Sequence, residues 1–182
     1  MNNAERILAE LDLQLDATVE LTLYGRAALS LGFPSPPEEF GQSTDVDAIL
    51  AMGQAEELLA ETNFWHAIEE TNEALADSGL YVSHLFAENQ VVLTATWKKS
   101  RVPISGPWHR LRVLRLGDED LLLSKLMRDD PHDREDALFI ARTAGLAARD
   151  VERLLLQAIV PPIPEIAEQF EAASKRLLQV LT

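Results

Sequence analysis

The stretch Thr22-Leu-Tyr-Gly-Arg-Ala-Ala-Leu-Ser-Leu-Gly32, followed by Thr44-Asp-Val-Asp47, decides the fold of this chain. Its beginning, from Val19 to Tyr24, is β-branched and aromatic enough to predict a short buried strand. Gly25 ends that strand, and the residues from Arg26 onward have the composition of a helix start. A glycine at a strand-to-helix turn lets a phosphate group approach the backbone, where the N-terminal amides of the helix point towards it.

A second strand is predicted from Asp45 to Ala51. Side chains at positions i and i+2 of a strand share one face, so Asp45 and Asp47 are expected to project together. Two adjacent carboxylates beside a phosphate-sized notch suit a magnesium ion and a nucleoside triphosphate, with manganese as a second candidate metal. The alternative is a glycine turn with two solvated aspartates at a strand end, because acidic pairs at this spacing recur along the chain.

These two strands and the segment between them define a candidate site. The predicted metal ligands are Asp45 and Asp47, and the predicted nucleotide-binding residues of this part of the chain are Gly25, Arg26, Ser43 and Thr44. Residues 32–41 contain three prolines and two glycines and are expected to form a loop. The loop is either a flap over the candidate site or a plain surface insertion.

Composition limits the class of protein. A chain of 182 residues with 47% hydrophobic and 25% charged residues suits one domain, or one domain with a helical extension, and can bury a core. The net charge of −14 argues against broad, non-specific binding of nucleic acid, although the middle of the chain is locally basic. The absence of cysteine excludes disulfides, thiolate zinc sites and thiol catalysis.

The sequence also predicts where the protein acts. Its first residues contain no basic stretch followed by an apolar core, so no secretory signal is expected. No apolar run approaches the roughly 20 residues that a membrane-spanning helix needs. We therefore expect a cytoplasmic protein with no membrane partner.

Hydrophobic periodicity predicts the remaining elements of the first part of the chain. Helices are expected at Ala4–Leu15 and at Gly53–Asp77, the second divided near Thr62-Asn63. The segments Leu80–Phe86 and Gln90–Trp97 are rich in β-formers and are expected to pair as a β-hairpin. Arg110–Leu116 is a further predicted strand, with Arg110 and Arg112 on one face and Arg115 on the other.

From Asp118 onward the chain is predicted to be helical. One helix begins at Asp118, and another begins with Asp130 as N-cap and Pro131 at the first helical position. Two more are expected at Arg149–Ile159 and Pro164–Leu181. The fold class is therefore α+β: residues 1–117 form a mixed sheet with helices, and residues 118–182 form a helical region packed on that core.

The order of these elements resembles the nucleotidyltransferase fold, in which a strand and glycine turn precede a strand with a metal-binding aspartate pair. The second half narrows the resemblance. Val113-Leu-Arg-Leu-Gly-Asp-Glu-Asp-Leu-Leu-Leu-Ser-Lys125, with Arg128 and His132-Asp-Arg-Glu-Asp136, is similar to nucleotidyltransferase-like proteins grouped with the AbiEii-type toxins of bacterial toxin–antitoxin systems. The similarity covers about residues 18 to 145.

This resemblance implies roles for individual residues. Gly25 would form the phosphate-side turn, the aspartate pair would hold magnesium, and Lys125 would bind the nucleotide by offsetting triphosphate charge. Asp136, or less favourably Asp133, would complete the polar site. The implied catalytic residues are Asp45, Asp47, Lys125 and Asp136. The alternative is structural: Lys125 complements a helix dipole from the helix surface, and the two later aspartates cap a helix.

The chain departs from the family pattern at two positions. Arg26 replaces a second small residue after the glycine, where it would either contact phosphate or fill the notch. Polymerase-like members also carry a third carboxylate on a later strand, but Gln90–Trp97 contains none, and Glu88 is the nearest. The usual group that deprotonates an attacking hydroxyl is therefore missing.

The resemblance implies magnesium-dependent transfer of a nucleoside monophosphate from a nucleoside triphosphate to an RNA, protein or small-molecule acceptor. It also implies an antitoxin or regulator as partner. A second hypothesis is a protein of this fold that binds nucleotide or a partner protein without turnover. A third is a structural α/β domain with an incidental aspartate pair.

Overall fold

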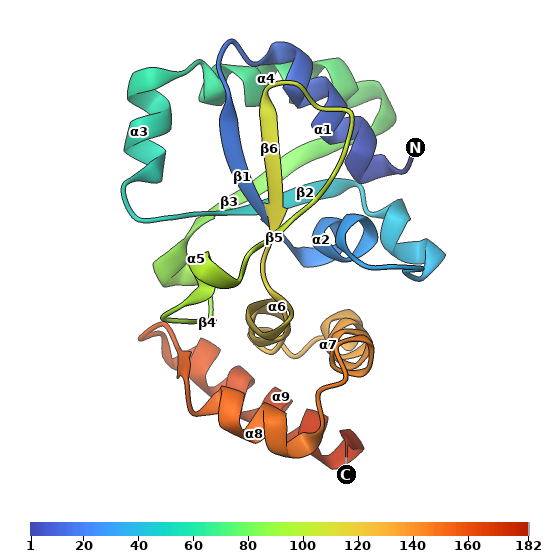
Figure 1. Cartoon of the computed structure of the whole chain (residues 1–182), viewed down its shortest axis with the longest axis vertical. Helices are drawn as coiled ribbons and strands as arrows, with labels where there is room; N and C mark the ends of the chain where they lie inside the picture. Colours follow the sequence, from blue (N-terminus) through green and yellow to red (C-terminus); the bar gives the residue numbers. More distant parts are fainter. Residues whose placement is uncertain (182) are drawn as a thin grey trace. The chain divides into compact units, whose positions relative to one another are not determined.

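The structure is a computed structural model that describes residues 1–181, and its internal contacts divide it into two compact units (Figure 1). The first unit comprises residues 1–88 and 101–115, and the second comprises residues 89–100 and the chain from residue 116 onward. The chain therefore passes between the units three times. Within residues 1–181, every helix is too short or too polar to span a lipid bilayer.

A five-stranded mixed sheet forms the centre of the first unit, in the order β3-β2-β1-β6-β5. Its strands are β1 (Val19–Tyr24), β2 (Asp45–Leu50), β3 (Tyr81–Ala87), β5 (Val102–Pro103) and β6 (Leu111–Arg115). Strand β1 runs antiparallel to β2 and parallel to β6, while β2 and β3 are parallel and β5 and β6 are antiparallel. The strands predicted for β1, β2 and β6 are confirmed to within one residue at each end.

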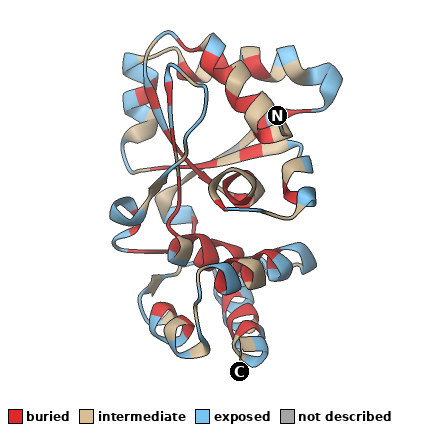
Figure 2. Ribbon diagram, turned by 45° about the vertical axis from the view of Figure 1, so that its right-hand side comes forward, coloured by how far each residue is buried: buried red, intermediate tan, exposed pale blue. Residues whose placement is uncertain are grey.

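Helices surround this sheet or pack on one another in the first unit. They are α1 (Asn3–Gln14), α2 (Gly25–Gly32), α3 (Gln54–Glu61) and α4 (Phe64–Leu75), with the short 3-10 helices η1 (Glu38–Gln42) and η2 (Ala76–Ser78). Helices α1, α2 and α4 contact the strands, and α1 also contacts α2 and α4. Apolar residues of α1 such as Ile7, Leu8 and Leu11 are fully buried, as are most apolar residues of the central strands (Figure 2). The predicted division near Thr62-Asn63 separates α3 from α4.

The loop between α2 and β2 is anchored by two aromatic side chains. Phe33 and Phe40 are buried, although the four residues 34–37 between them form no regular helix or strand. The guanidinium of Arg26 lies over the Phe40 ring at 5.3 Å, and that of Arg115 lies over the Phe33 ring at 4.3 Å. Cation–π contacts and buried aromatic area thus fix this proline-rich loop at both ends.

The predicted β-hairpin between residues 80 and 97 is wrong. Strand β3 pairs in parallel with β2, so it joins the large sheet on the side away from β1. The next strand, β4 (Leu93–Thr94), pairs instead with β7 (Ala158–Ile159) in a separate two-stranded sheet. Between β3 and β4 the chain forms the 3-10 helix η3 (Glu88–Gln90), and Trp97 begins α5 (Trp97–Ser100) rather than ending a strand.

The second unit is mainly helical, and it includes residues 89–100. Its helices are α5, α6 (Asp118–Lys125), α7 (Pro131–Thr143), α8 (Ala148–Leu155) and α9 (Pro164–Leu181). Asp120 of α6 is buried and accepts hydrogen bonds from the backbone N–H of Thr94 at 2.7 Å and from Ser100 Oγ at 2.9 Å. A Cβ on Gly117 would lie 2.6 Å from the Ser100 carbonyl oxygen, so α6 can begin at this place only behind a glycine.

The predicted ends of the C-terminal helices hold with one exception. Asp130 caps α7 by accepting the backbone N–H of Asp133, with Pro131 at the first helical position, and α9 has the predicted bounds. The helix expected to reach Ile159 stops at Leu155, because Ala158 and Ile159 leave the helix to pair with β4.

Candidate functional site

Gly25 forms the turn between β1 and α2, and its conformation explains why a glycine stands there. Its φ is +68°, in the region that residues with a Cβ adopt only with strain. A Cβ at this position would also lie 3.0 Å from Oδ2 of Asp47. Tyr24, the residue before the turn, is the register partner of Asp47 in the β1–β2 ladder. The glycine turn is therefore next to Asp47, as the sequence predicted.

The two aspartates of β2 lie on one face of the strand. Asp45 and Asp47 are half-buried and alternate with Val46 and Ala48, which are fully buried. This alternation is the pattern of a strand with one apolar and one polar face. Asp45 and Asp47 are thus neighbours on the polar face of β2 rather than solvated ends of a strand.

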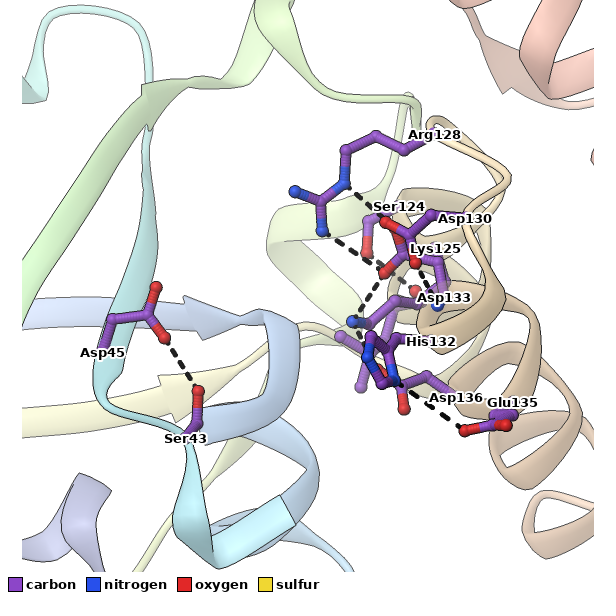
Figure 3. Close-up of polar contacts among 11 residues, drawn as sticks. Ser43, Asp45, Ser124, Lys125, Arg128, Asp130, His132, Asp133, Glu135 and Asp136 are labelled. Atoms are coloured by element: carbon purple, nitrogen blue, oxygen red, sulfur yellow. Dashed lines mark hydrogen bonds and ion pairs between the residues drawn. The ribbon is translucent and has the colours of Figure 1, made fainter. Parts of the chain in front are cut away.

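Each of these carboxylates accepts a hydrogen bond from a serine hydroxyl. Ser43 Oγ donates to Asp45 Oδ1 at 2.7 Å (Figure 3), and Ser83 Oγ on β3 donates to Asp47 Oδ1. The sequence indicated Ser43 as a nucleotide-binding residue, but the structure bonds it to the first aspartate. Ser83 was not predicted at all, because the expected hairpin placed β3 beside the wrong strand.

The remaining nucleotide-binding candidates of the first unit lie near the turn or the start of β2. Thr44 is exposed, and its carbonyl oxygen accepts the N–H of Tyr81 at 3.1 Å where β2 and β3 begin to pair. Arg26 follows Gly25 directly and is half-buried against Phe40. Its guanidinium is thus directed to the anchored loop.

The carboxylates of Asp45 and Asp47 supply part of the ligand set that a hard divalent cation needs. Among the residues that the structure describes, no three His, Cys, Asp or Glu side chains gather as a metal-binding group. Two carboxylates on one strand face are nevertheless the number that magnesium takes when substrate phosphates and water supply its other ligands. The space beside Gly25, which a Cβ would fill, adjoins one of these carboxylates. The residues therefore fit a magnesium ion that binds together with a polyphosphate.

No acidic residue of β3 supplements the pair. Strand β3 reads Tyr-Val-Ser-His-Leu-Phe-Ala and contains no carboxylate. Glu88 follows directly after β3, where its Oε1 accepts the backbone N–H of Met52 at 3.2 Å. On β3, Ser83 contacts an aspartate of the pair through its hydroxyl group.

Lys125 belongs to an ionic cluster of the second unit, which we define as Lys125, Arg128, Asp133 and Asp136 (Figure 3). Lys125 Nζ lies 2.7 Å from Asp136 Oδ2 and 3.0 Å from Asp133 Oδ1. Arg128 donates to both oxygens of Asp133, at 3.0 and 3.3 Å. Two cations thus balance two carboxylates within the cluster.

The expected place of Lys125 on a helix surface is wrong. Its side chain is only 5% exposed, and those of Asp133 and Asp136 are 3% and 0% exposed. Eleven positions separate Lys125 from Asp136, and the chain turns back between α6 and α7, so both residues face each other from two helices. The capping role offered as an alternative for the aspartates belongs to Asp130. The action of Lys125 and Asp136 on a nucleotide stays a prediction.

Asp130 itself shows how capping affects a carboxyl group here. Burial acts to raise the pKa of Asp130, but hydrogen bonds to it, led by the backbone N–H of Asp133, outweigh burial and hold the pKa below its usual value. The lowered pKa means that the cap stays ionised and interacts favourably with the N-terminus of α7.

The basic residues of β6 divide between the two faces as predicted. Arg112 is exposed, whereas Arg115 is buried, stacks on Phe33 and donates to the Gly32 carbonyl oxygen at 3.1 Å. Arg115 therefore fixes the end of α2 in the first unit. A basic surface for RNA on this strand cannot include it.

Comparison with known proteins identifies the family. Residues 4–160 match the model of a family described as "Nucleotidyltransferase of unknown function (DUF6036)". No curated protein and no solved structure shows significant similarity to the chain. The match spans most of the sequence and includes the glycine turn, the aspartate pair and the ionic cluster. The chain therefore belongs to this family of nucleotidyltransferases.

Proposed function

We propose that this protein transfers a nucleoside monophosphate from a nucleoside triphosphate to a hydroxyl group of an RNA, protein or small-molecule acceptor, with magnesium or manganese bound. The observation that carries the proposal is the aspartate pair of β2 beside the Gly25 turn. Asp45 and Asp47 share the polar face of one strand, and Asp47 Oδ2 adjoins the space that a glycine alone leaves open. Family membership supports the same reaction class.

The residues of the first unit would act mainly by binding and orientation. The backbone N–H groups of the first turn of α2 are suited to hold a phosphate group, because a helix N-terminus carries partial positive charge. Asp45 and Asp47 would hold the metal ion, which when bound offsets the charge of the triphosphate and lowers the pKa of coordinated oxygen. Such placement supplies most of the catalysis in phosphoryl-type transfer.

In the reaction that we propose, one bond forms at the α-phosphorus and one bond breaks. The acceptor oxygen forms a bond to the α-phosphorus, the bond from that phosphorus to the bridging oxygen breaks, and pyrophosphate leaves. In this proposed reaction, the acceptor proton passes to solvent or to the leaving group, and β3 offers no carboxylate to take it. Turnover is therefore expected to be slow.

The test is label transfer from each of the four α-labelled nucleoside triphosphates, with magnesium or manganese, into total cellular RNA and protein. We expect a labelled acceptor in at least one reaction. The double variant Asp45→Asn, Asp47→Asn should show no transfer while keeping its fold. Thermal unfolding provides a second readout, because a ligand that binds only the native state raises Tm, and the double variant should lose that rise.

A non-catalytic binding protein is the second candidate function, and one observation favours it. Where an acidic residue on β3 could reach Asp47, the structure has Ser83. Nucleotide binding without label transfer to any acceptor would favour this candidate over the enzyme.

The partner that we propose follows from the resemblance to AbiEii-type toxins of bacteria. It is a small antitoxin or regulator protein, encoded beside this chain, that suppresses the activity. Co-expression should then relieve any growth defect that the chain alone causes, and the double aspartate variant should cause none.

A further inference from the structure

We infer that Ser83 is a positioning residue that fixes the orientation of the Asp47 carboxylate, an inference that rests on the proposed function. The hydroxyl of Ser83 donates a hydrogen bond to Asp47 Oδ1 across 36 residues of sequence. The same carboxylate has its Oδ2 beside Gly25. The two oxygens of Asp47 are thus distinguished by the structure: one faces a serine of β3, and the other faces the glycine turn.

An irregularity of β3 explains why a serine reaches this oxygen. Between two successive register pairs, β2 advances two residues, from Val46 to Ala48, while β3 advances three, from Val82 to Leu85. Strand β3 therefore carries one extra residue opposite Asp47. A β-bulge of this kind bends its strand and re-aims a side chain, and bulges are frequent beside active sites.

The chemistry of the donor matters for a metal site. A carboxylate can rotate about its terminal bond through a broad, two-fold range, so an isolated aspartate presents either oxygen. A hydroxyl donor on one oxygen restricts that rotation and leaves the other oxygen on the side of the Gly25 turn. Hydrogen bonds of this kind orient metal ligands and affect metal affinity strongly. A third carboxylate at this position would instead add a like charge beside Asp47.

Asp45 offers an internal comparison. Its hydroxyl partner, Ser43, precedes it by two residues in the same segment, so the contact is local. Ser83 comes from a neighbouring strand, and its contact depends on the β2–β3 register. The orientation of Asp47, unlike that of Asp45, is therefore set by tertiary structure.

The experiment compares two nearly isosteric replacements, Ser83→Thr and Ser83→Val, which differ in one hydroxyl group. Both β-branched residues suit a strand. Calorimetry would measure the affinity of Mn²⁺ together with each α,β-methylene nucleoside triphosphate analogue, and electron paramagnetic resonance would record the bound Mn²⁺. We expect the Thr variant to bind within about threefold of wild type and the Val variant to bind roughly 10- to 100-fold more weakly, with an altered Mn²⁺ spectrum.

Three controls separate the outcomes. Ser30→Ala removes a serine hydroxyl that bonds only to its own helix backbone, and it should leave affinity unchanged. Asp47→Asn should abolish binding. If Asp47→Asn binds normally, the proposed function is wrong for this site, and the inference falls with it.

If Asp47→Asn abolishes binding but the Thr and Val variants bind equally well, Ser83 does not position the carboxylate, and the proposed function stands. Melting temperatures of both variants show whether the fold is intact. Should Ser83→Val unfold, Ser83→Ala takes its place, and recovery by Thr alone remains the deciding result.

Discussion

The aspartate pair of β2 and the ionic cluster of the second unit use the same charged group in opposite ways. Asp45 and Asp47 are half-buried, and each accepts a hydrogen bond from a neutral serine hydroxyl. Asp133 and Asp136 are almost fully buried and bond directly to cationic side chains. In the first arrangement hydroxyl groups orient half-buried carboxylates, whereas in the second cationic side chains balance buried carboxylates. Carboxylates of the second kind stabilise a fold, and those of the first kind are suited to bind a cation.

The largest effect that this comparison predicts is on the stability of the ionic cluster. Lys125→Ala leaves two buried carboxylates without their shared ammonium group, and it should lower the free energy of unfolding by about 3–5 kcal/mol. Urea unfolding at neutral pH measures the loss. Lys175→Ala on α9, where the side chain is 69% exposed, is the control and should change little.

A double variant tests the same ion pair by removing both of its charges. Lys125→Met combined with Asp136→Leu removes the charge of both partners and leaves Asp133 bonded to Arg128. This double variant should recover most of the lost stability. A Lys125→Ala protein as stable as wild type would show that the cluster is not a structural ion pair, and would return Lys125 to the role of a ligand-binding lysine.

The next effect is on activity rather than on stability. Asp45→Asn and Asp47→Asn should each reduce label transfer at least about a hundredfold, as does the removal of a major electrostatic stabiliser. Neither should lower the free energy of unfolding by more than about 1 kcal/mol, since both side chains are half-buried and asparagine can still accept the serine hydrogen bond. Asp77→Asn, an exposed aspartate of the first unit, is the control. A large loss of stability in either variant would mean that Asp45 and Asp47 stabilise the fold, as Asp133 and Asp136 do.

Asp12 is a third kind of carboxylate, satisfied by backbone groups. It is buried on α1 and accepts the successive N–H groups of residues 109–111 at 2.7–3.0 Å. Burial acts to raise the pKa of Asp12, but these backbone bonds outweigh it and the pKa is lowered. A lowered pKa in the folded state means that the charged form stabilises the fold at neutral pH, and that this contribution is lost as the pH falls through the carboxyl range.

We therefore expect Asp12→Asn to cost about 2 kcal/mol at pH 7, within the range for hydrogen bonds to a charged group. The difference from wild type should shrink between about pH 5 and pH 2, as the wild-type carboxylate becomes protonated. Urea unfolding of both proteins across this range is the measurement. A difference that does not depend on pH would mean that shape, not charge, holds residues 109–111 in place.

The smallest effect concerns the cap of α7. Asp130→Ala removes the acceptor for the Asp133 N–H and should lower the free energy of unfolding by about 1 kcal/mol. Asp130→Asn should retain most of that stability, because asparagine is an equally favoured N-cap. If the Ala variant instead matches the loss of Lys125→Ala, the cap also organises the ionic cluster.

Local patterns predicted the elements well wherever a few neighbouring residues decide the conformation. The strand, turn and helix around Gly25, the break at Thr62-Asn63, the Asp130 cap and the bounds of α9 all follow from short-range chemistry. The prediction of a hairpin was wrong because the partner of a β-strand is not decided by neighbouring residues. Leu93 pairs with Ile159, far along the chain, and no pattern within either segment indicates the other.

The candidate site divides in the same way. The i and i+2 spacing of Asp45 and Asp47 was enough to place both on one strand face. Ser83 could not be found, since its contact depends on the parallel pairing of β2 with β3 and on the extra residue in β3. Lys125 and Asp136 meet because α6 and α7 fold back on each other. The family resemblance grouped these two residues in one site, but no local pattern in the sequence indicated an ion pair between them.

The segments of the two units alternate along the sequence, and this order has a consequence for biosynthesis. Residues 89–100 leave the ribosome before residue 116, yet the groups that hold them, Asp120 and β7, are made later. During translation this segment, with Trp97 in it, has none of these partners and is a natural target for a chaperone. A fragment that ends before α6 should therefore be prone to aggregation, even though it contains all five strands of the large sheet.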